Sequence, residues 1–143
     1  MKVVYLFFVV IFITAFGGCK KEATAIDISK ICSPDNEKKY VVTTGQLDDR
    51  GSIFCSNTGG RMDCGLDVIA AVGGPRVFGA DIEQGGGANQ IEKLPSGYKR
   101  EDIKIHDNSG KVINLGDKVT LTGQMSIAPD GSVCFMKVDK IDG

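Results

Sequence analysis

The amino-acid sequence predicts a small all-β domain. Three stretches are rich in β-branched residues or alternate between apolar and polar side chains, as strands with one buried face do: residues 39–47, 62–72 and 118–127. Clusters of Gly, Asp, Asn, Ser and Pro, such as residues 107–110 and 129–131, separate the stretches and mark turns. The chain has 143 residues, of which 19 are Gly and none is Trp, and this length suits one small domain.

A short helix is expected before the first strand. Residues 27–32 carry apolar side chains at Ile28 and Ile31, and either Asp27 or Thr24 is available as an N-cap. The following Ser-Pro pair ends the helix, because the residue before proline is pushed out of the helical region. The first strand, KYVVTTGQL, then runs to a turn of Asp, Arg and Gly.

A β-hairpin is predicted around Gly59-Gly60. Its arms are residues 52–57 and 62–72, and a two-residue turn between them needs positive φ at both positions, which glycine supplies at little cost. On the second arm every other residue from Cys64 onward is apolar, so one face of that arm is buried.

The middle of the chain is expected to be a long insertion. Residues 79–100 contain Gly-Gly-Gly and Pro-Ser-Gly and are predicted to be mostly loop, with a short helix at 88–94. Residues 102–106 and 111–115 then flank a turn and form a second hairpin.

The last two strands are residues 118–127 and 132–141. The first of them alternates regularly between apolar and polar side chains. The second has a mixed pattern in which the neighbours Cys134 and Phe135 both favour burial, so a β-bulge is expected in it.

The C-terminal stretch LGDKVTLTGQMSIAPDGSVCFMKVDKI resembles the closing hairpin of OB-fold barrels, in which G-D-x-V-x-x-x-G opens the fourth strand. KYVVTTGQL is similar to the first strand of such barrels. The resemblance implies an OB-like Greek-key barrel of five strands that closes its own edges, with a short N-terminal helix and a long loop insertion. A small β-sandwich is the alternative, and neither fold by itself gives a function.

The N-terminus has the pattern of an export signal followed by a lipid anchor. Lys2 precedes an uninterrupted apolar run, Val3–Ile13, as a charged n-region precedes an h-region. The run is shorter than the roughly 20 residues that span a bilayer. Residues 16–19, FGGC, resemble the lipobox of bacterial lipoproteins, in which the cysteine takes a diacylglyceryl thioether and becomes the new N-terminus. We therefore expect a cleaved signal peptide at 1–18 and lipidation at Cys19.

The charged tract after Cys19 indicates where the lipoprotein goes. Lys20 follows the cysteine, and by resemblance to sorting rules of Gram-negative bacteria this residue favours the outer membrane over retention in the inner membrane. Acyl chains on Cys19 would anchor the protein there, facing the periplasm or the cell surface. Residues 19–25 are then a lipidated tether and residues 26–143 the folded domain.

The other four cysteines predict two disulfides. An even number of cysteines in an exported domain points to disulfide bonds, because the periplasm is oxidising. The Gly-Gly turn places Cys55 opposite Cys64 at a non-hydrogen-bonded pair, where Cα atoms lie about 4.5 Å apart, within disulfide range. Cys32 is then left to pair with Cys134. A zinc site is disfavoured, because the chain has no C-x-x-C and only one histidine, His106.

Catalytic and cofactor motifs are absent from the sequence. It contains no P-loop, no G-x-S-x-G and no H-E-x-x-H. The formal net charge is −1, and removing Lys2 with the signal leaves about −2, so there is no general electrostatic attraction to nucleic acid. We expect a protein that is not an enzyme and that needs no metal or cofactor.

The function expected from these features is that of a membrane-anchored envelope lipoprotein that binds or assembles a protein, peptide or glycan partner. Two alternatives stay open: a hydrolase with a dispersed acidic site at Asp63, Asp67 and His106, and an oligonucleotide-binding barrel. The phenylalanines are expected either on a binding face or in the core. The residues expected on a binding face are Phe54, Arg61, Arg76, Phe78, Tyr98 and Lys99.

Overall fold

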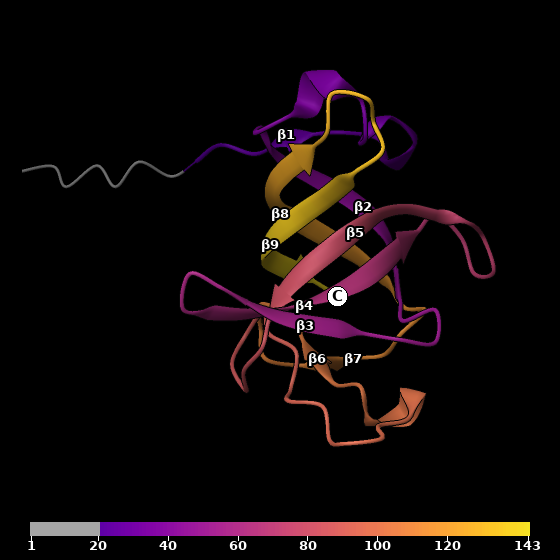
Figure 1. Cartoon of the computed structure of the whole chain (residues 1–143), viewed down its shortest axis with the longest axis vertical. Helices are drawn as coiled ribbons and strands as arrows, with labels where there is room; N and C mark the ends of the chain where they lie inside the picture. Colours follow the sequence, from indigo (N-terminus) through magenta and orange to yellow (C-terminus); the bar gives the residue numbers. More distant parts are fainter. Residues whose placement is uncertain (1–20) are drawn as a thin grey trace, which may run out of the picture.

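Five strands form a closed barrel in the computed structural model, which describes residues 21–143 (Figure 1). Neighbouring strands follow the order β2–β4–β5–β9–β8, and β8 pairs with β2 to close the sheet. The β5–β9 pairing is parallel and the other four are antiparallel. The barrel strands are β2 (Tyr40–Asp48), β4 (Arg61–Ile69), β5 (Arg76–Glu83), β8 (Lys118–Ile127) and β9 (Cys134–Asp142).

This barrel confirms the predicted all-β, five-stranded, OB-like fold class and excludes the sandwich. The identity of one strand was predicted wrongly. Residues 79–83, expected in a loop, belong to β5, the third barrel strand. The segment expected as the second strand instead gives β3 (Phe54–Thr58), which lies outside the closed barrel and pairs with β4 alone among the described strands. Glycine and aspartate within β5 lower its strand propensity, and pairing with β4 and β9 along both edges overrides that preference.

Alternation along the strands builds the core. In β8 the buried residues are Val119, Leu121, Gly123, Met125 and Ile127, and every residue between them is at least partly exposed. The same period of two appears in β4 and β5, so each barrel strand sends one set of side chains inward and the other outward.

The bulge expected in the last strand is present, at a different place. Thr122 pairs with Lys140 and Gly123 with Val138, so Asp139 is the extra residue of β9. Cys134 and Phe135 keep the regular alternation, since Cys134 is buried and Phe135 is half-buried. A side chain at Gly123 would overlap the carbonyl oxygen of Lys137, so the close approach of β8 to β9 requires a glycine there.

The N-terminal segment covers one end of the barrel. The expected helix is a single 3₁₀ turn, η1 (Ile28–Lys30), and the side chain of Asp27 caps it by accepting the Ser29 N–H at 2.9 Å. Ile31, just after this turn, is fully buried in the core. A second 3₁₀ turn, η2 (Pro34–Asn36), follows. The short strand β1 (Thr24–Ala25), placed by the sequence in the tether, pairs with β2.

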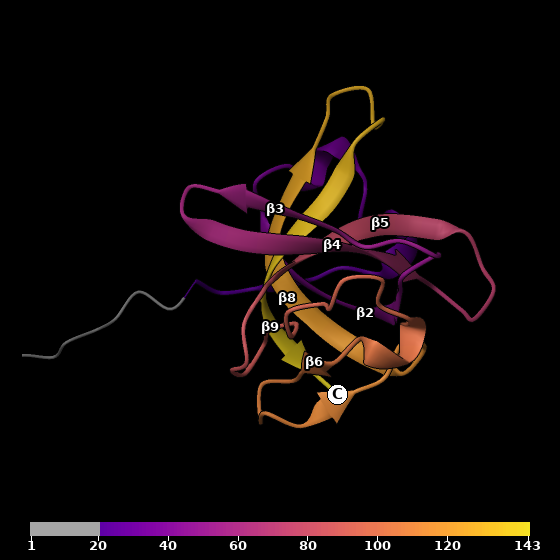
Figure 2. The ribbon, with the colours of Figure 1, turned by 60° about the horizontal axis from the view of Figure 1, so that its bottom comes forward.

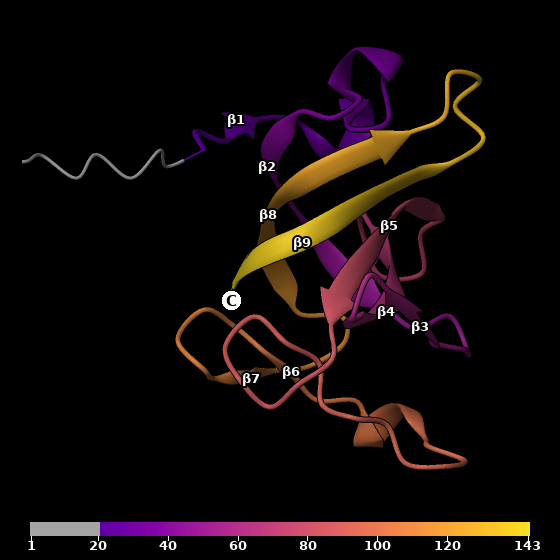
Figure 3. The same cartoon turned by 60° about the vertical axis from the view of Figure 1, so that its left-hand side comes forward.

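The insertion between β5 and β8 covers the opposite end (Figure 3). It holds η3 (Arg100–Asp102) and the expected hairpin, which consists of β6 (Ile105–His106) and β7 (Val112–Ile113). The helix predicted at 88–94 does not form, and isolated bridges join Ile91 to both Gln84 and Ile105 instead.

Isoleucine side chains hold the insertion against the barrel. Ile91, Ile103, Ile105 and Ile113 are all buried in the same core cluster as the barrel residues. The Asn108 N–H also donates to the Ile141 carbonyl of β9 at 2.6 Å. The insertion is therefore part of the fold rather than a free loop.

Both predicted disulfides are present. The pairing around Gly59-Gly60 brings Cys55 opposite Cys64 with a Cα–Cα distance of 4.0 Å, and Cys32 is bonded to Cys134 with a Cα–Cα distance of 5.7 Å. The second bond ties the N-terminal segment to the start of β9. Cys19 and the predicted signal peptide lie outside the described residues.

Removing the long-range disulfide should destabilise the domain more than removing the hairpin disulfide. Cys32 and Cys134 are separated by 102 residues and Cys55 and Cys64 by 9, and in the chain-entropy model the longer loop restricts the unfolded chain more. We expect a paired Cys32→Ser/Cys134→Ser change to lower the free energy of unfolding by about 2–5 kcal/mol in urea titrations. An equal or larger loss from Cys55→Ser/Cys64→Ser, the matched control, would contradict this ranking.

Candidate binding face

The outward side chains of β3, β4, β5 and β9 form one continuous surface, which we call the outer face. On β4 the inward residues are Cys64, Leu66 and Val68, so the residues between them point outward. Registers between neighbouring strands align the outward residues in rows across the sheet. The residues of the outer face are Phe54, Ser56, Arg61, Asp63, Gly65, Asp67, Arg76, Gly79, Asp81, Glu83, Phe135 and Lys137.

Two ion-paired clusters lie on this face. In one, Arg61 forms an ion pair with Asp63 and reaches Glu83 with an Nη1–Oε2 distance of 3.9 Å. In the other, Asp67 lies between Arg76, with an Oδ1–Nε distance of 3.3 Å, and Arg50, with an Oδ2–Nε distance of 3.7 Å. The three arginines are thus engaged by carboxylates of the protein itself.

Two glycines lie between the clusters. Gly65 on β4 stands in register between Phe54 on β3 and Asp81 on β5, and a Cβ at this position would lie 3.5 Å from the Asp81 Oδ1 atom. A Cβ at Gly79 would lie 3.5 Å from the Cβ of Phe135 and would collide with the Arg76 guanidinium. The missing side chain at Gly65 leaves the backbone partly exposed at the centre of the face, whereas Gly79 is buried under the Arg76 guanidinium.

Asp81 is the carboxylate without an ion pair on the outer face of the described chain. Burial, and next the negative charge of Asp63, raise the pKa of Asp81 above its usual value. Lys137 is its register neighbour on β9, yet no ion pair joins the two side chains. Asp81 can therefore accept hydrogen bonds or a positive charge from a bound molecule.

The residues predicted for a binding face divide into two groups. Arg61 and Arg76 lie on the outer face, as does Phe54, which is 79% exposed. Phe78 was placed wrongly, because its side chain points into the barrel and is 0% exposed. Phe78 therefore fills the core, which was the second place expected for the phenylalanines.

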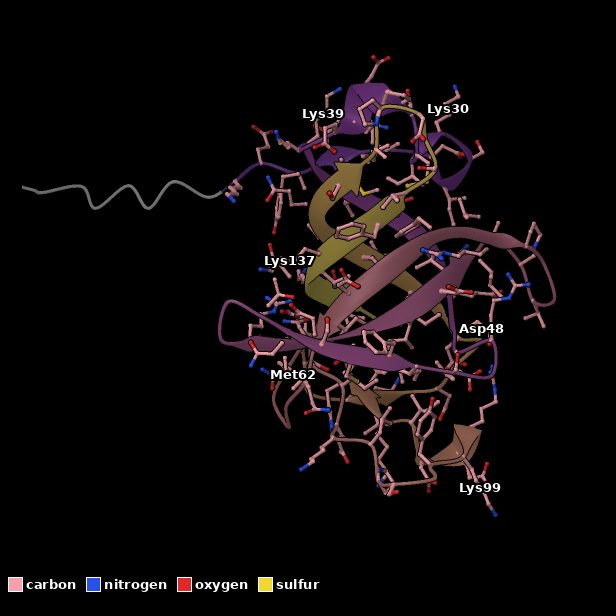
Figure 4. The ribbon with its side chains drawn as sticks, viewed as in Figure 1. Lys30, Lys39, Asp48, Met62, Lys99 and Lys137 are labelled. Atoms are coloured by element: carbon pink, nitrogen blue, oxygen red, sulfur yellow. A yellow bond between two sulfur atoms is a disulfide. The ribbon has the colours of Figure 1, made fainter. Side chains whose placement is uncertain are left out.

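The other two predicted residues belong to the insertion rather than to the outer face. The Tyr98 hydroxyl accepts the Ile53 N–H at 2.5 Å, so this side chain caps the start of β3. Lys99 is exposed at the N-cap of η3, where its backbone N–H donates to Asp102. Figure 4 shows Lys99 far from Lys137 of the outer face.

The structure does not bring Asp63, Asp67 and His106 together. Asp63 and Asp67 are four residues apart on one strand, a separation of about 13 Å, and each is held by arginine. The His106 Nδ1 lies 3.1 Å from the Gly110 carbonyl oxygen and its Nε2 lies 2.8 Å from the Glu92 Oε1, both in the insertion. Acid–base partners must converge on one substrate, and these three side chains do not.

Sequence reasoning missed Gly79 and Asp81 because β5 was not recognised as a strand. It missed Gly65 and Phe135, which lie on predicted strands, because their pairing with β5 is what places them on this face. The stretch RVFGADIE does contain the signal. Phe78, Ala80 and Ile82 alternate with polar or small residues, which is the pattern of a half-buried strand.

No other described part of the molecule offers a stronger site. A hollow of about 870 Å³ at the N-terminal segment is wide open and is lined by residues 25–39, a single stretch of chain. Within residues 21–143 no group of three or more His, Cys, Asp or Glu side chains is arranged to hold a metal ion. Over the same residues no helix is long and apolar enough to cross a membrane.

Comparison with models of known protein families, with curated protein sequences and with solved structures finds no match to this chain.

The stability of the domain should fall as pH rises through the folded-state pKa of His106. Only the imidazolium can donate to both the Gly110 carbonyl and the Glu92 carboxylate, and these two contacts raise the pKa of His106. The stabilisation is fully present below the unfolded-state pKa of about 6.5 and is lost above the folded value. Unfolding free energies measured from pH 5 to 9 should therefore decline more steeply for the wild type than for His106→Gln. Parallel profiles would refute the assignment.

Proposed function

We propose that this protein is a lipid-anchored binding or assembly module of the bacterial cell envelope, without catalytic activity, that holds a partner on its outer face. The observation that carries the proposal is Phe54. This phenylalanine is 79% exposed, and it stands beside the open backbone at Gly65 and the unpaired carboxylate of Asp81. An exposed aromatic next to a free polar group is typical of a contact site in an interface.

The position of this face in the barrel supports the proposal by analogy. In OB-type barrels the face of the second and third strands, with the adjoining loops, binds polymeric ligands. Here those strands are β4 and β5, and β3 belongs to the connection between the first and second barrel strands. The analogy concerns the fold and gives the place of binding, not the ligand.

The charges of the outer face favour a peptide, protein or glycan over a nucleic acid. Sites for single-stranded nucleic acid combine stacking aromatics with a positively charged groove. The outer face carries four carboxylates, and its arginines are already bound by three of them: Asp63, Asp67 and Glu83. A phosphate backbone would meet Asp81, with Lys137 as the cation of the described outer face that is outside an ion pair, whereas a basic or amide-bearing partner could bind Asp81 directly.

The contacts of Asp63, Asp67 and His106 support the proposal that the protein has no catalytic activity. A general base or nucleophile needs a partner and a shared substrate position. Asp63 and Asp67 are neutralised by arginines on opposite parts of the face, and His106 is bound within the insertion.

The envelope location in the proposal comes from the N-terminal sequence. An apolar run followed by FGGC predicts lipidation of Cys19, and the folded domain begins within a few residues of that cysteine, since β1 starts at Thr24. A short tether would hold the barrel close to the membrane surface, facing the periplasm or the cell exterior. Lipid attachment would then make anchoring stable.

Replacing Cys19 should release the protein from membranes without changing its fold. Cys19→Ser removes the thiol that takes the diacylglyceryl group, while the core begins beyond it. We expect the wild-type protein in the outer-membrane fraction, with mass spectrometry showing an acylated N-terminal Cys19 and no peptide from residues 1–18. The variant should lack the acyl mass and leave the membrane fraction. A wild-type chain that is soluble and unacylated would refute the proposed anchor.

A partner that binds the outer face should be lost when Phe54 is truncated. We expect wild-type protein, cross-linked in intact cells and purified from solubilised membranes, to recover a specific envelope component. Phe54→Ala should reduce that recovery about tenfold or more, because an aromatic anchor at the centre of an interface contributes about 2 kcal/mol or more. Asp81→Asn should weaken it as well if the partner is cationic.

The matched control for Phe54 is Val112→Ala. Val112 is a partly exposed apolar residue, 42% accessible, on β7 of the insertion and away from the outer face. Recovery with this variant should equal that of the wild type. Equal recovery with Phe54→Ala, or loss with both variants, would place binding elsewhere and refute the outer face as the site.

A further inference from the structure

The strand β3 is an edge of the sheet. The strand order over the described residues ends at β3, which pairs with β4 on one side and with no strand on the other. The hairpin of β3 and β4 projects from the barrel wall, so this edge is not covered by the rest of the described fold (Figure 2). A free edge presents backbone donors and acceptors that can pair with another strand.

The register of the hairpin determines which backbone groups face outward. The Gly59-Gly60 turn makes Thr58–Arg61 a hydrogen-bonded pair, and such pairs recur at every second residue. The Met62 carbonyl accepts from Gln84 on the side of β5, which confirms the assignment on β4. The N–H and C=O groups of Cys55 and Asn57 therefore point away from β4, and no backbone partner for them lies within residues 21–143.

Both ends of this free edge are closed. The next outward N–H along the chain, that of Ile53, is already bound by the Tyr98 hydroxyl. At the other end Gly59 and Gly60 turn the chain back into β4, with positive φ at both residues. The available edge is therefore the five-residue stretch of β3.

The edge lacks the features by which proteins protect exposed strands. Natural edges carry lysine, proline, a bulge or an inward charge. The strand FCSNT has none of these, its pairing with β4 is regular, and its first residue is the exposed Phe54. The Cys55–Cys64 disulfide holds the strand in place, so pairing with it would cost little additional ordering.

We propose that β3 pairs with β3 of a second copy of this chain, antiparallel, about a two-fold axis through Ser56. In this register Cys55 of each copy faces Asn57 of the other, so all the outward N–H and C=O groups of both strands are bonded. A register with Cys55 opposite Cys55 would need the Ile53 N–H that Tyr98 occupies, and one with Asn57 opposite Asn57 would place Cys55 opposite the Gly59 turn.

Charge supports a second copy as the occupant. No side chain of β3 is charged, so self-pairing brings no like charges together along the ladder. The interface is isologous, as two-fold dimers require. Residues opposite each other in a sheet share a face, so the outer faces of the two copies would join, with Phe54 of each copy opposite Thr58 of the other.

A cysteine on the two-fold axis tests the register in the full chain. At a non-hydrogen-bonded pair the Cα atoms of Ser56 and its symmetry mate would lie about 4.5 Å apart, within disulfide range. We expect Ser56→Cys to give a disulfide-linked dimer as the main species on non-reducing gels of intact envelopes. The control is Thr58→Cys on the same face, whose copies would lie about 13 Å apart and should stay monomeric. Peptide mapping should show Cys55–Cys64 intact in both variants.

Charged residues at position 56 give a second test, in which the dimer dissociation constant is measured. Purified Ser56→Glu and Ser56→Lys proteins should each show a dimer dissociation constant raised about fivefold or more over the wild type, because like charges directly opposite are unfavourable. A mixture of the two variants should restore dimers in sedimentation equilibrium.

Three results would overturn the proposal. One is cross-linking of Ser56→Cys no stronger than that of Thr58→Cys. Another is a mixed disulfide of Ser56→Cys with a different protein, which would assign the edge to another partner. The third is a mixture of Glu and Lys variants that stays as monomeric as either variant alone. The first and third results do not bear on the partner of the outer face, which Phe54→Ala tests separately; the second does, because Ser56 lies on that face.

Discussion

The structure depends on one edge of β4, which two different strands, β3 and β2, share as pairing partners. Along its other edge β4 pairs with β5 without a break until the bulge after Val68. On the divided edge Arg61–Gly65 pair with β3, and Asp67–Ile69 pair with β2. The second pairing closes the barrel, and the first keeps β3 outside it. The closed core, the projecting hairpin and the extended outer face all follow from this division.

Closing the barrel leaves two open ends, and the chain covers both with irregular structure. Ile31 enters from the N-terminal segment, and the insertion contributes four buried isoleucines at the opposite end. The Cys32–Cys134 bond joins the first of these covers to the barrel. Because side chains fill the interior and both ends, the described barrel encloses a packed core, and the binding proposed above is assigned to the outside of the sheet.

The outside of the sheet is organised by charge pairing around two glycines. Arginines bound by neighbouring carboxylates make the face nearly neutral, so binding there would depend on shape and on a few free groups rather than on long-range attraction. Phe54, Asp81 and Lys137 are such groups, and Gly65 separates Phe54 from Asp81. The same strand that carries Phe54 also carries the free backbone edge, so self-association and partner binding would use adjacent surfaces of one hairpin.

The sequence by itself determined the features that depend on local geometry or on composition. The Gly59-Gly60 turn sets the register of its hairpin and so the Cys55–Cys64 bond, with Cys32–Cys134 following by elimination. Alternation over 118–127 predicted a strand with the bounds observed for β8. These features are encoded by residues close together in the chain, where turn chemistry and the period of two act directly.

Only the tertiary structure decided which strands enter the barrel and which residues share a face. The stretch that becomes β5 has weak strand propensity, and it is stabilised by partners distant in sequence on both edges, including the parallel strand β9. Phe54 and Phe78 look alike in sequence, yet one is exposed and the other buried, because β3 leaves the barrel and β5 does not. Asp81 joined the candidate face for the same reason: non-local pairing, not local pattern, places it beside Gly65.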